Sequence, residues 1–346
     1  RDSVDTWKKI CAISRKGFQE IYNVLDVTIE ERGESFYNPM LPKVVKDFEE
    51  KGLLTLSDGA KCVFLEGFLN KEGEPLPLIL QKADGGYNYA TTDMAALFHR
   101  INEEKAERIL YVVDSGQHLH FDMIFKSARQ AKYLDQKVDA KHVPFGVVLG
   151  ADGKKFKTRS GKTEKLIDLL KEAVRQAEVI LSERMGDVSE KELKEKSQIL
   201  GIDAVKYADL SCHRVKDYMF SYERMLKFEG NTAAYLLYSY VRIQGIKRKV
   251  GKVSTGVIDL KEKSEIALGL HLRQFPEVLE MAAKDCLPNR LADYLYGLAE
   301  KFHLFFRDCR VEGSDQEDAR LSLCELTASI LKQGLQILGL KTLDRM

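Results

Sequence analysis

A loop rich in lysine and arginine follows a short apolar segment of this sequence. The loop, GADGKKFKTRSGKTEK at residues 150–165, carries six basic side chains against the acids Asp152 and Glu164. Its glycines permit tight turns. Flexible cations after a strand suit a phosphate chain whose charge changes during a reaction. The loop is not a Walker loop, because Gly-x4-Gly-Lys-Ser/Thr is absent. The alternative is a solvated surface hairpin.

A phenol and a carboxylate stand four residues apart in YATTDMAALF, as Tyr89 and Asp93. This segment is typical of a helix start, with Thr91 or Thr92 as the N-cap. At the mouth of a sheet, the carboxylate would suit a cationic ligand, and a guanidinium best, because a guanidinium pairs bidentately. Alternatively, Asp93 complements the helix dipole from the first turn.

The segment VVDSGQHLHFD ends an apolar strand with polar side chains. Gln117 would lie at the crevice of the sheet, where its amide can both donate and accept hydrogen bonds. A rival interpretation is a metallohydrolase whose metal is held by nearby acids and imidazoles, namely Asp114, His118, His120 and Asp122. The third interpretation is a histidine that caps or packs at the start of a helix.

Aromatic and basic residues alternate along GNTAAYLLYSYVRIQGIKRKV, a predicted helix capped by Asn231 or Thr232. Outside its apolar stripe lie Tyr235, Tyr238, Arg242, Lys247, Arg248 and Lys249. Such a surface can hold single-stranded RNA by stacking on bases and by contact with phosphates. A core helix with a basic tail is the alternative.

A predicted strand–helix–strand unit would position several of the candidate residues described above. The segments 107–114 and 141–150 read as strands buried on both faces, and 118–134 as the helix between them. Such a unit predicts a parallel sheet with a right-handed crossover, and ligands bind outside the carboxyl ends of its strands. The loops 114–117 and 150–162 would both lie there.

Helices dominate both ends of the sequence. Residues 3–25 form an amphipathic pattern whose apolar stripe needs a surface to cover. From about residue 164 onward no strand pattern is evident, so a helical bundle is predicted. Ser189 followed by Glu192, and Ser314 followed by Glu317, are capping signals within it.

Composition limits the classes of protein. The 346 residues include 54 Lys and Arg against 53 Asp and Glu, so a polyanion must be bound by local patches. Neither a membrane span nor a signal peptide is predicted. The six cysteines are scattered and none forms Cys-x-x-Cys, which favours reduced thiols in an intracellular protein and no structural metal.

Taken in order along nearly the whole chain, several segments resemble arginyl-tRNA synthetases, a family of class I aminoacyl-tRNA ligases. The segments are ISRKGFQEIY, RGESFYNPMLPKV, YNYATTDMAAL, ILYVVDSGQHLHF, FGVVLGADGKKFKTRSG, DAVKYADLSCHRVKDYMFSYERML and GNTAAYLLYSYVRI. The resemblance implies an α/β Rossmann-type parallel sheet, incomplete at its N-terminal side, followed by an all-α helical bundle. The catalytic domain would span 1–220, with a helical connection at 164–220, and the anticodon-binding domain 221–346.

The resemblance also implies a reaction. L-arginine and ATP, with Mg²⁺, would give arginyl-adenylate and pyrophosphate, and the arginyl group would pass to the 3′ end of tRNA(Arg). By position, arginine would be bound by Tyr89, Asp93 and Gln117. ATP would be bound by His120, Lys155, Phe156 and Lys157. KFKTRS stands where the class signature Lys-Met-Ser-Lys-Ser is expected, so the catalytic candidates are Lys155, Lys157 and Arg159.

The tRNA-binding residues implied by the resemblance are Tyr235, Tyr238, Arg242, Lys247, Phe306 and Met346. Family members often carry tyrosine where Phe306 stands, and phenylalanine can stack but has no hydroxyl. The expected location is the cytoplasm, with an organellar form as the alternative, and other synthetases in a complex would be additional partners.

One family signature is absent from the sequence. His-x-Gly-His, which in the family precedes the segment ISRKGF, does not occur. Much of the adenine side of the ATP site would therefore be missing, and we predict that this chain alone does not form adenylate. The closest alternative function is a non-catalytic tRNA-binding or scaffolding fragment.

Overall fold

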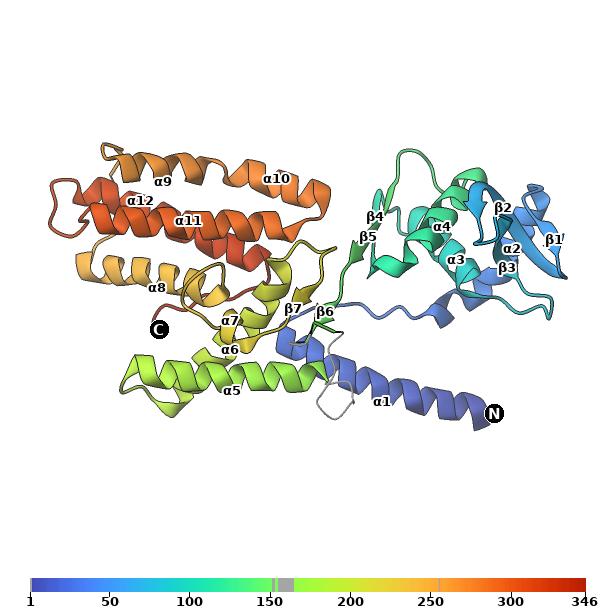
Figure 1. Cartoon of the computed structure of the whole chain (residues 1–346), viewed down its shortest axis with the longest axis horizontal. Coiled ribbons are helices and arrows are strands. Elements are labelled where there is room, and N and C mark those ends of the chain that lie inside the picture. Colours follow the sequence, from blue (N-terminus) through green and yellow to red (C-terminus); the bar gives the residue numbers. More distant parts are fainter. Residues whose placement is uncertain (1, 151–152, 155–164, 255) are drawn as a thin grey trace. The chain divides into compact units, whose positions relative to one another are not determined.

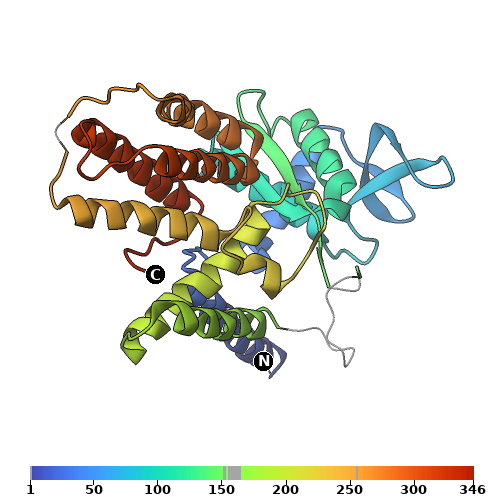
Figure 2. The ribbon, with the colours of Figure 1, turned by 60° about the vertical axis from the view of Figure 1, so that its left-hand side comes forward.

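The computed structural model describes residues 2–150, 153–154, 165–254 and 256–346. The chain divides into two compact units, one of Glu30–Gly146 and one of Arg1–Ile29 with Val147–Met346. Figures 1 and 2 show the elements of each. Each unit has a hydrophobic core of its own.

The unit Glu30–Gly146 contains two small sheets and the helices that cover them. Its elements are η1 (Glu34–Met40), α2 (Leu41–Glu50), β1 (Thr55–Ser57), β2 (Ala60–Leu69), β3 (Pro75–Gln81), α3 (Tyr89–Asn102), β4 (Arg108–Asp114), η2 (Ser115–Gln117), α4 (His118–Gln130) and β5 (Asp139–Phe145). Strands β1, β2 and β3 form an antiparallel sheet. Strands β4 and β5 pair in parallel, from Arg108↔Asp139 to Asp114↔Phe145, with α4 as the crossover. The predicted strand–helix–strand unit is confirmed.

Strand β4 is covered on one face by the described residues. Ile109 and Tyr111 are buried, and the Tyr111 ring packs 4.8 Å from that of Phe121 on α4. Leu110 and Val112, on the other face, are 42% and 66% exposed. The prediction of burial on both faces is therefore wrong for the described part of the chain, because helix packing covers one side of this two-stranded sheet.

The unit that ends at Met346 is mostly helical. Its elements are α1 (Asp2–Leu25), β6 (Val148–Leu149), α5 (Leu166–Met185), α6 (Glu190–Leu210), β7 (Tyr218–Met219), α7 (Tyr222–Met225), α8 (Ala233–Val250), α9 (Lys263–Arg273), α10 (Phe275–Asp285), α11 (Pro288–Asp308) and α12 (Glu317–Ile337). Helices α5 and α6 lie close together, and a Cβ at Gly201 would come within 2.6 Å of the Val174 Cα. Helices α8, α9, α11 and α12 share the main core.

The segment 141–150 is not one strand. It divides at Gly146 into β5, paired with β4, and β6, which pairs in parallel with β7. The Val147 N–H donates to the Asp217 carboxylate at 2.8 Å, which holds the chain where it leaves β5. Strand β7 also interrupts the region predicted to be helical throughout. The basic loop thus follows the β6–β7 pair, not the β4–β5 sheet.

Helix α1 begins and ends as the pattern predicts, but most of its apolar stripe is not covered. Trp7, Ile10 and Phe18 are 50–58% exposed, while Val24 and Leu25 pack against the core. The surface that the pattern calls for is therefore supplied, within the described chain, only to the C-terminal end of this helix. No described helix combines the length and hydropathy needed to cross a membrane.

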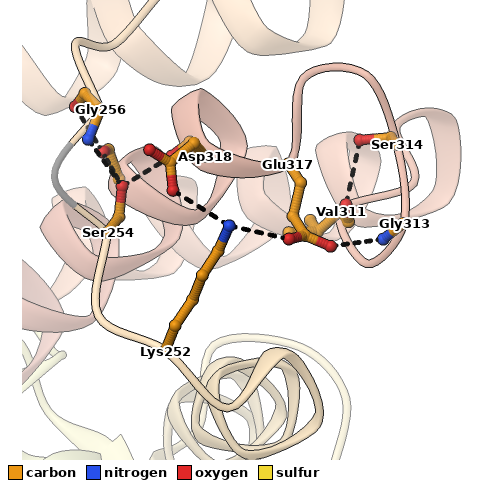
Figure 3. Close-up of polar contacts among 9 residues, drawn as sticks. Lys252, Ser254, Gly256, Val311, Gly313, Ser314, Glu317 and Asp318 are labelled. Atoms are coloured by element: carbon orange, nitrogen blue, oxygen red, sulfur yellow. Dashed lines mark hydrogen bonds and ion pairs between the residues drawn. The ribbon is translucent and has the colours of Figure 1, made fainter.

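One of the two capping signals is confirmed. The Ser189 hydroxyl accepts the Glu192 N–H at 3.2 Å, at the start of α6. Ser314 does not cap α12, because its hydroxyl donates to the Val311 carbonyl instead. The Glu317 carboxylate accepts the Gly313 N–H at 2.6 Å (Figure 3). The Glu317 side chain, together with the backbone hydrogen bond from its own N–H to the Ser314 carbonyl at 3.0 Å, therefore ties this helix start to the preceding turn.

Candidate functional site

Helix α3 positions the acidic candidate. Its N-cap is Asn88, whose side chain accepts the Ala90 N–H at 3.0 Å. The prediction of a threonine cap is wrong, because Thr91 is buried and its hydroxyl donates to the Leu80 carbonyl. Since the helix begins earlier than predicted, Asp93 lies beyond the first turn. The helix dipole therefore accounts for this carboxylate less well than the sequence suggested.

Asp93 and Tyr89 meet an imidazole from the next helix. The Nε2 atom of His120, on α4, lies 2.6 Å from Oδ2 of Asp93. The His120 and Tyr89 rings are 4.7 Å apart in an edge-to-face arrangement. The side chain of Asp93 is 28% exposed and that of His120 is 11% exposed. One carboxylate oxygen is thus fixed by the protein beside an exposed phenol, an arrangement suited to a cation with planar N–H donors.

Gln117 lies at the same end of α4, three residues before His120, and is exposed. No described contact joins its amide to Asp93 or Tyr89. The structure therefore brings two of the three predicted arginine contacts together and leaves the third nearby on the chain. His120, predicted to bind ATP, lies instead with the arginine candidates, and its ATP role stays a prediction.

The four metal candidates make separate local contacts. Asp114 caps η2 by accepting the Gly116 N–H at 2.8 Å. His118 pairs with Asp122 on the same helix at 3.2 Å, whereas His120 turns to Asp93. Across the described ranges, no group of three or more His, Cys, Asp or Glu is placed to hold a metal. None of the six cysteines, all of which lie in the described part of the chain, forms a disulfide.

The loop candidates Lys155, Phe156, Lys157 and Arg159 lie outside the described residues. The described start of the loop is a tight turn directly after β6. The Gly153 N–H donates to the Gly150 carbonyl at 3.0 Å, and the Gly150 N–H donates to the Lys154 carbonyl at 2.8 Å. Gly153 has φ of +69°, which favours glycine.

The RNA-binding candidates form a cluster on α8 and α11. Thr232 caps α8 by accepting the Tyr235 N–H at 3.1 Å, as predicted. The guanidinium carbon of Arg242 lies 4.6 Å from the Tyr238 ring centroid and 4.8 Å from that of Phe306. We call Tyr235, Tyr238, Arg242 and Phe306 the aromatic–basic cluster. A cation that lies near two aromatic rings can meet both a base and a phosphate.

Two of the candidates are not in this cluster. Lys247 points to Glu325 on α12, with 3.9 Å between Nζ and Oε1. Met346 packs against the hydrophobic core. The helical period explains the first separation, because Tyr238 and Arg242 share a face of α8 at a spacing of four residues and Lys247 does not.

Sequence reasoning missed one residue that contacts this cluster. His303, on α11, lies with Nδ1 2.8 Å from Arg242 Nη1 and Nε2 2.8 Å from the Ser239 hydroxyl. Burial first, and then the Arg242 charge, lower the pKa of His303 to about 4. Its position three residues before Phe306 in FHLFFRDC is the signal that could have identified it.

Comparison with known proteins identifies the family of this chain. Residues 1–222 match the model for the catalytic domain of tRNA synthetases class I (R), and residues 236–346 match the DALR anticodon binding domain. The arginine–tRNA ligase of Protochlamydia amoebophila is 61% identical over 348 residues, which cover 99% of this chain and 60% of that protein. That of Chlamydia caviae is 53% identical over 343 residues, covering 98% and 60%.

Solved structures agree with these matches. Arginyl-tRNA synthetase from Plasmodium falciparum superposes with a TM-score of 0.87 at 36% identity, covering all of this chain and 59% of that one. The Thermus thermophilus enzyme, at 22% identity over 94% of this chain and 61% of that one, has the same fold with a TM-score of 0.81. The predicted α/β sheet followed by an all-α bundle is confirmed. The chain spans about 60% of the length of these relatives and belongs to the arginine-type class I tRNA synthetases, with the catalytic domain followed by a DALR anticodon-binding domain.

Proposed function

We propose that this protein is the catalytic and anticodon-binding part of an arginine–tRNA ligase. The observation that carries the proposal is the Asp93 carboxylate, fixed by His120 at 2.6 Å and placed near the exposed Tyr89 ring. A partly exposed carboxylate of fixed orientation is suited to the guanidinium of arginine. The arginine–tRNA ligases to which the chain is similar support the same substrate.

The proposed chemistry needs no nucleophile from the protein. The arginine carboxylate attacks the α-phosphate of ATP, and pyrophosphate leaves. A ribose hydroxyl of the terminal adenosine of tRNA(Arg) then takes the arginyl group from the adenylate, and AMP leaves. Catalysis consists of positioning the reactants and of stabilising charge on the phosphates. We assign the second task to Lys155, Lys157 and Arg159, with Mg²⁺ accompanying ATP.

Replacing Asp93 by asparagine in the full-length enzyme tests the arginine site. Asp93→Asn keeps the size of the side chain and removes its charge, so we expect the KM for arginine to rise by about tenfold or more. The matched control is Asp122→Asn, since Asp122 pairs with His118 on α4 and makes no described contact with Asp93. Equal effects of the two substitutions would contradict the assignment.

We further propose that the 346-residue chain alone does not form arginyl-adenylate. Its sequence lacks His-x-Gly-His, and it spans about 60% of the relatives' length. The measurement is arginine-dependent exchange between ATP and pyrophosphate with tRNA present, with the full-length enzyme as the positive control. Exchange by the chain alone would overturn the proposal. Binding of tRNA without exchange would favour the alternative of a tRNA-binding fragment.

A further inference from the structure

The hydrogen bonds around His303 have a defined direction. A guanidinium can only donate, so Nδ1 of His303 must accept from Nη1 of Arg242, 2.8 Å away. The proton of a neutral imidazole then lies on Nε2, which donates to the Ser239 hydroxyl at 2.8 Å. That hydroxyl donates in turn to the Tyr235 carbonyl at 2.8 Å. The series runs from Arg242 to the backbone of α8 and assigns the Nε2–H tautomer.

The surroundings of His303 favour its neutral form. Facing the ring from α8 are the Arg242 guanidinium and the phenols of Tyr235 and Tyr238. Phe302 contacts it from its own helix, with ring centroids 5.6 Å apart. Burial and the Arg242 charge both oppose protonation, which places the pKa of His303 at about 4. Protonation would also set two donors against each other across the 2.8 Å contact.

The same contacts leave Arg242 little freedom. Its guanidinium donates to His303 and to the Tyr238 hydroxyl, and lies near the Tyr238 and Phe306 rings. A long side chain ordered before binding loses less conformational entropy when a ligand arrives. Because Phe306 is 41% exposed, a ligand can reach the cluster from that side.

We propose that His303 is a positioning residue for tRNA binding, which in its neutral Nε2–H form holds the Arg242 guanidinium between Tyr238 and Phe306 for contact with a single-stranded loop. The role rests on the proposed function, because tRNA is the ligand. His303 itself acts through Arg242 and does not need to touch the RNA.

Three variants separate positioning from folding. His303→Phe keeps a ring and removes both hydrogen bonds, and we expect tRNA(Arg) affinity of the 346-residue chain to fall by about 5- to 30-fold. His303→Gln offers an acceptor and a donor and should restore most of the affinity. The matched control is His271→Phe, because His271 donates to the Tyr294 carbonyl within the same unit and outside the cluster.

The decisive comparison uses the Arg242→Ala background. If His303 acts through Arg242, adding His303→Phe to Arg242→Ala should lower the tRNA(Arg) affinity little further. The reason is that both substitutions remove the same interaction, the contact of Arg242 with the RNA. Additive losses would overturn the positioning role, as would equal affinities of wild type and His303→Phe.

NMR of the imidazole nitrogens provides a measurement independent of RNA. We expect an Nε2–H tautomer that stays neutral from pH 6 to 8, and an Nδ1–H tautomer would also overturn the role.

The two proposals fail in different ways. If the wild-type chain does not bind tRNA(Arg), the proposed function of this surface fails and the role of His303 fails with it. If the wild type binds and the variants bind equally well, only the positioning role fails.

Discussion

At the scale of single residues, each candidate site holds its charged group with an imidazole from another helix. His120 lies 2.6 Å from the Asp93 carboxylate, and His303 lies 2.8 Å from the Arg242 guanidinium. A histidine can hydrogen-bond either to a carboxylate or to a guanidinium, because each ring nitrogen donates or accepts according to the tautomer and the protonation state. In each site the imidazole fixes the orientation of a side chain that we propose to be a ligand contact.

Phe306 allows a test at this scale. Its ring contributes a face to the Arg242 guanidinium at 4.8 Å, and this contact needs no hydroxyl. We therefore expect Phe306→Tyr to change tRNA affinity less than about twofold, and Phe306→Ala to lower it about tenfold, as for loss of one stacking partner. Titration of tRNA(Arg) against each variant measures both. A Tyr variant as weak as the Ala variant would mean that the ring is not the relevant feature.

At the scale of elements, buried charges connect the helices of the larger unit. Glu265 of α9 is 1% exposed and accepts the Lys261 and Glu262 N–H groups, each at 2.8 Å. Its carboxylate also pairs with Arg320 of α12 at 2.7 Å. Lys252, in contrast, forms exposed pairs with Glu317 and Asp318 at the start of α12 (Figure 3).

These two contacts predict opposite results of substitution. Arg320→Ala leaves the buried Glu265 carboxylate without its countercharge, so we expect a loss of about 3–5 kcal/mol in the free energy of unfolding. Lys252→Ala should leave the unfolding midpoint nearly unchanged, because solvent screens its pairs. Urea unfolding followed by circular dichroism measures both. Comparable losses in the two variants would contradict this distinction.

Asp203 of α6 predicts a pH dependence. Burial raises its pKa to about 7, against an ordinary value of 3.8, while the Lys341 N–H donates to its carboxylate at 2.8 Å. The folded chain therefore binds this proton more tightly than the unfolded chain. The stability that the proton confers is present below about pH 4 and is lost as pH rises through about 7.

Asp203→Asn should remove this dependence while keeping an acceptor for Lys341. Between pH 5 and 8, we expect the wild type to lose about 2–4 kcal/mol of unfolding free energy relative to the variant. Urea titrations at several pH values give the difference. A constant difference across that range would show that Asp203 does not titrate as described.

At the scale of the whole molecule, a net charge of +1 means that the proposed binding of tRNA must depend on local basic patches. The logarithm of the tRNA association constant should fall linearly with the logarithm of the salt concentration. If each side chain contacts a phosphate, we expect Arg242→Ala and Lys247→Ala each to make this fall less steep by about 1 in slope. The control is Lys191→Ala, which changes an exposed lysine paired with Glu195 on α6. An unchanged slope in both Arg242→Ala and Lys247→Ala would place the tRNA elsewhere.

Much of the fold could be predicted from local pattern. The β4–α4–β5 unit, the Thr232 cap and the helical second half follow from hydrophobic periodicity and capping chemistry, which act over a few residues. The division of 141–150 into two strands could not be predicted, since β6 depends on β7 and on Asp217, some 70 residues away. The N-cap at Asn88 was missed because Thr91 is held by Leu80 of β3.

The sequence by itself determined the residue types of both candidate sites and the family to which they belong, because motif identity and order need no coordinates. Only the tertiary structure showed which side chains contact one another in these sites. It placed His120 against Asp93 and His303 against Arg242, and it separated Lys247 and Met346 from the aromatic–basic cluster. These pairings join different helices, so their geometry depends on packing between elements and not on the spacing of residues within one.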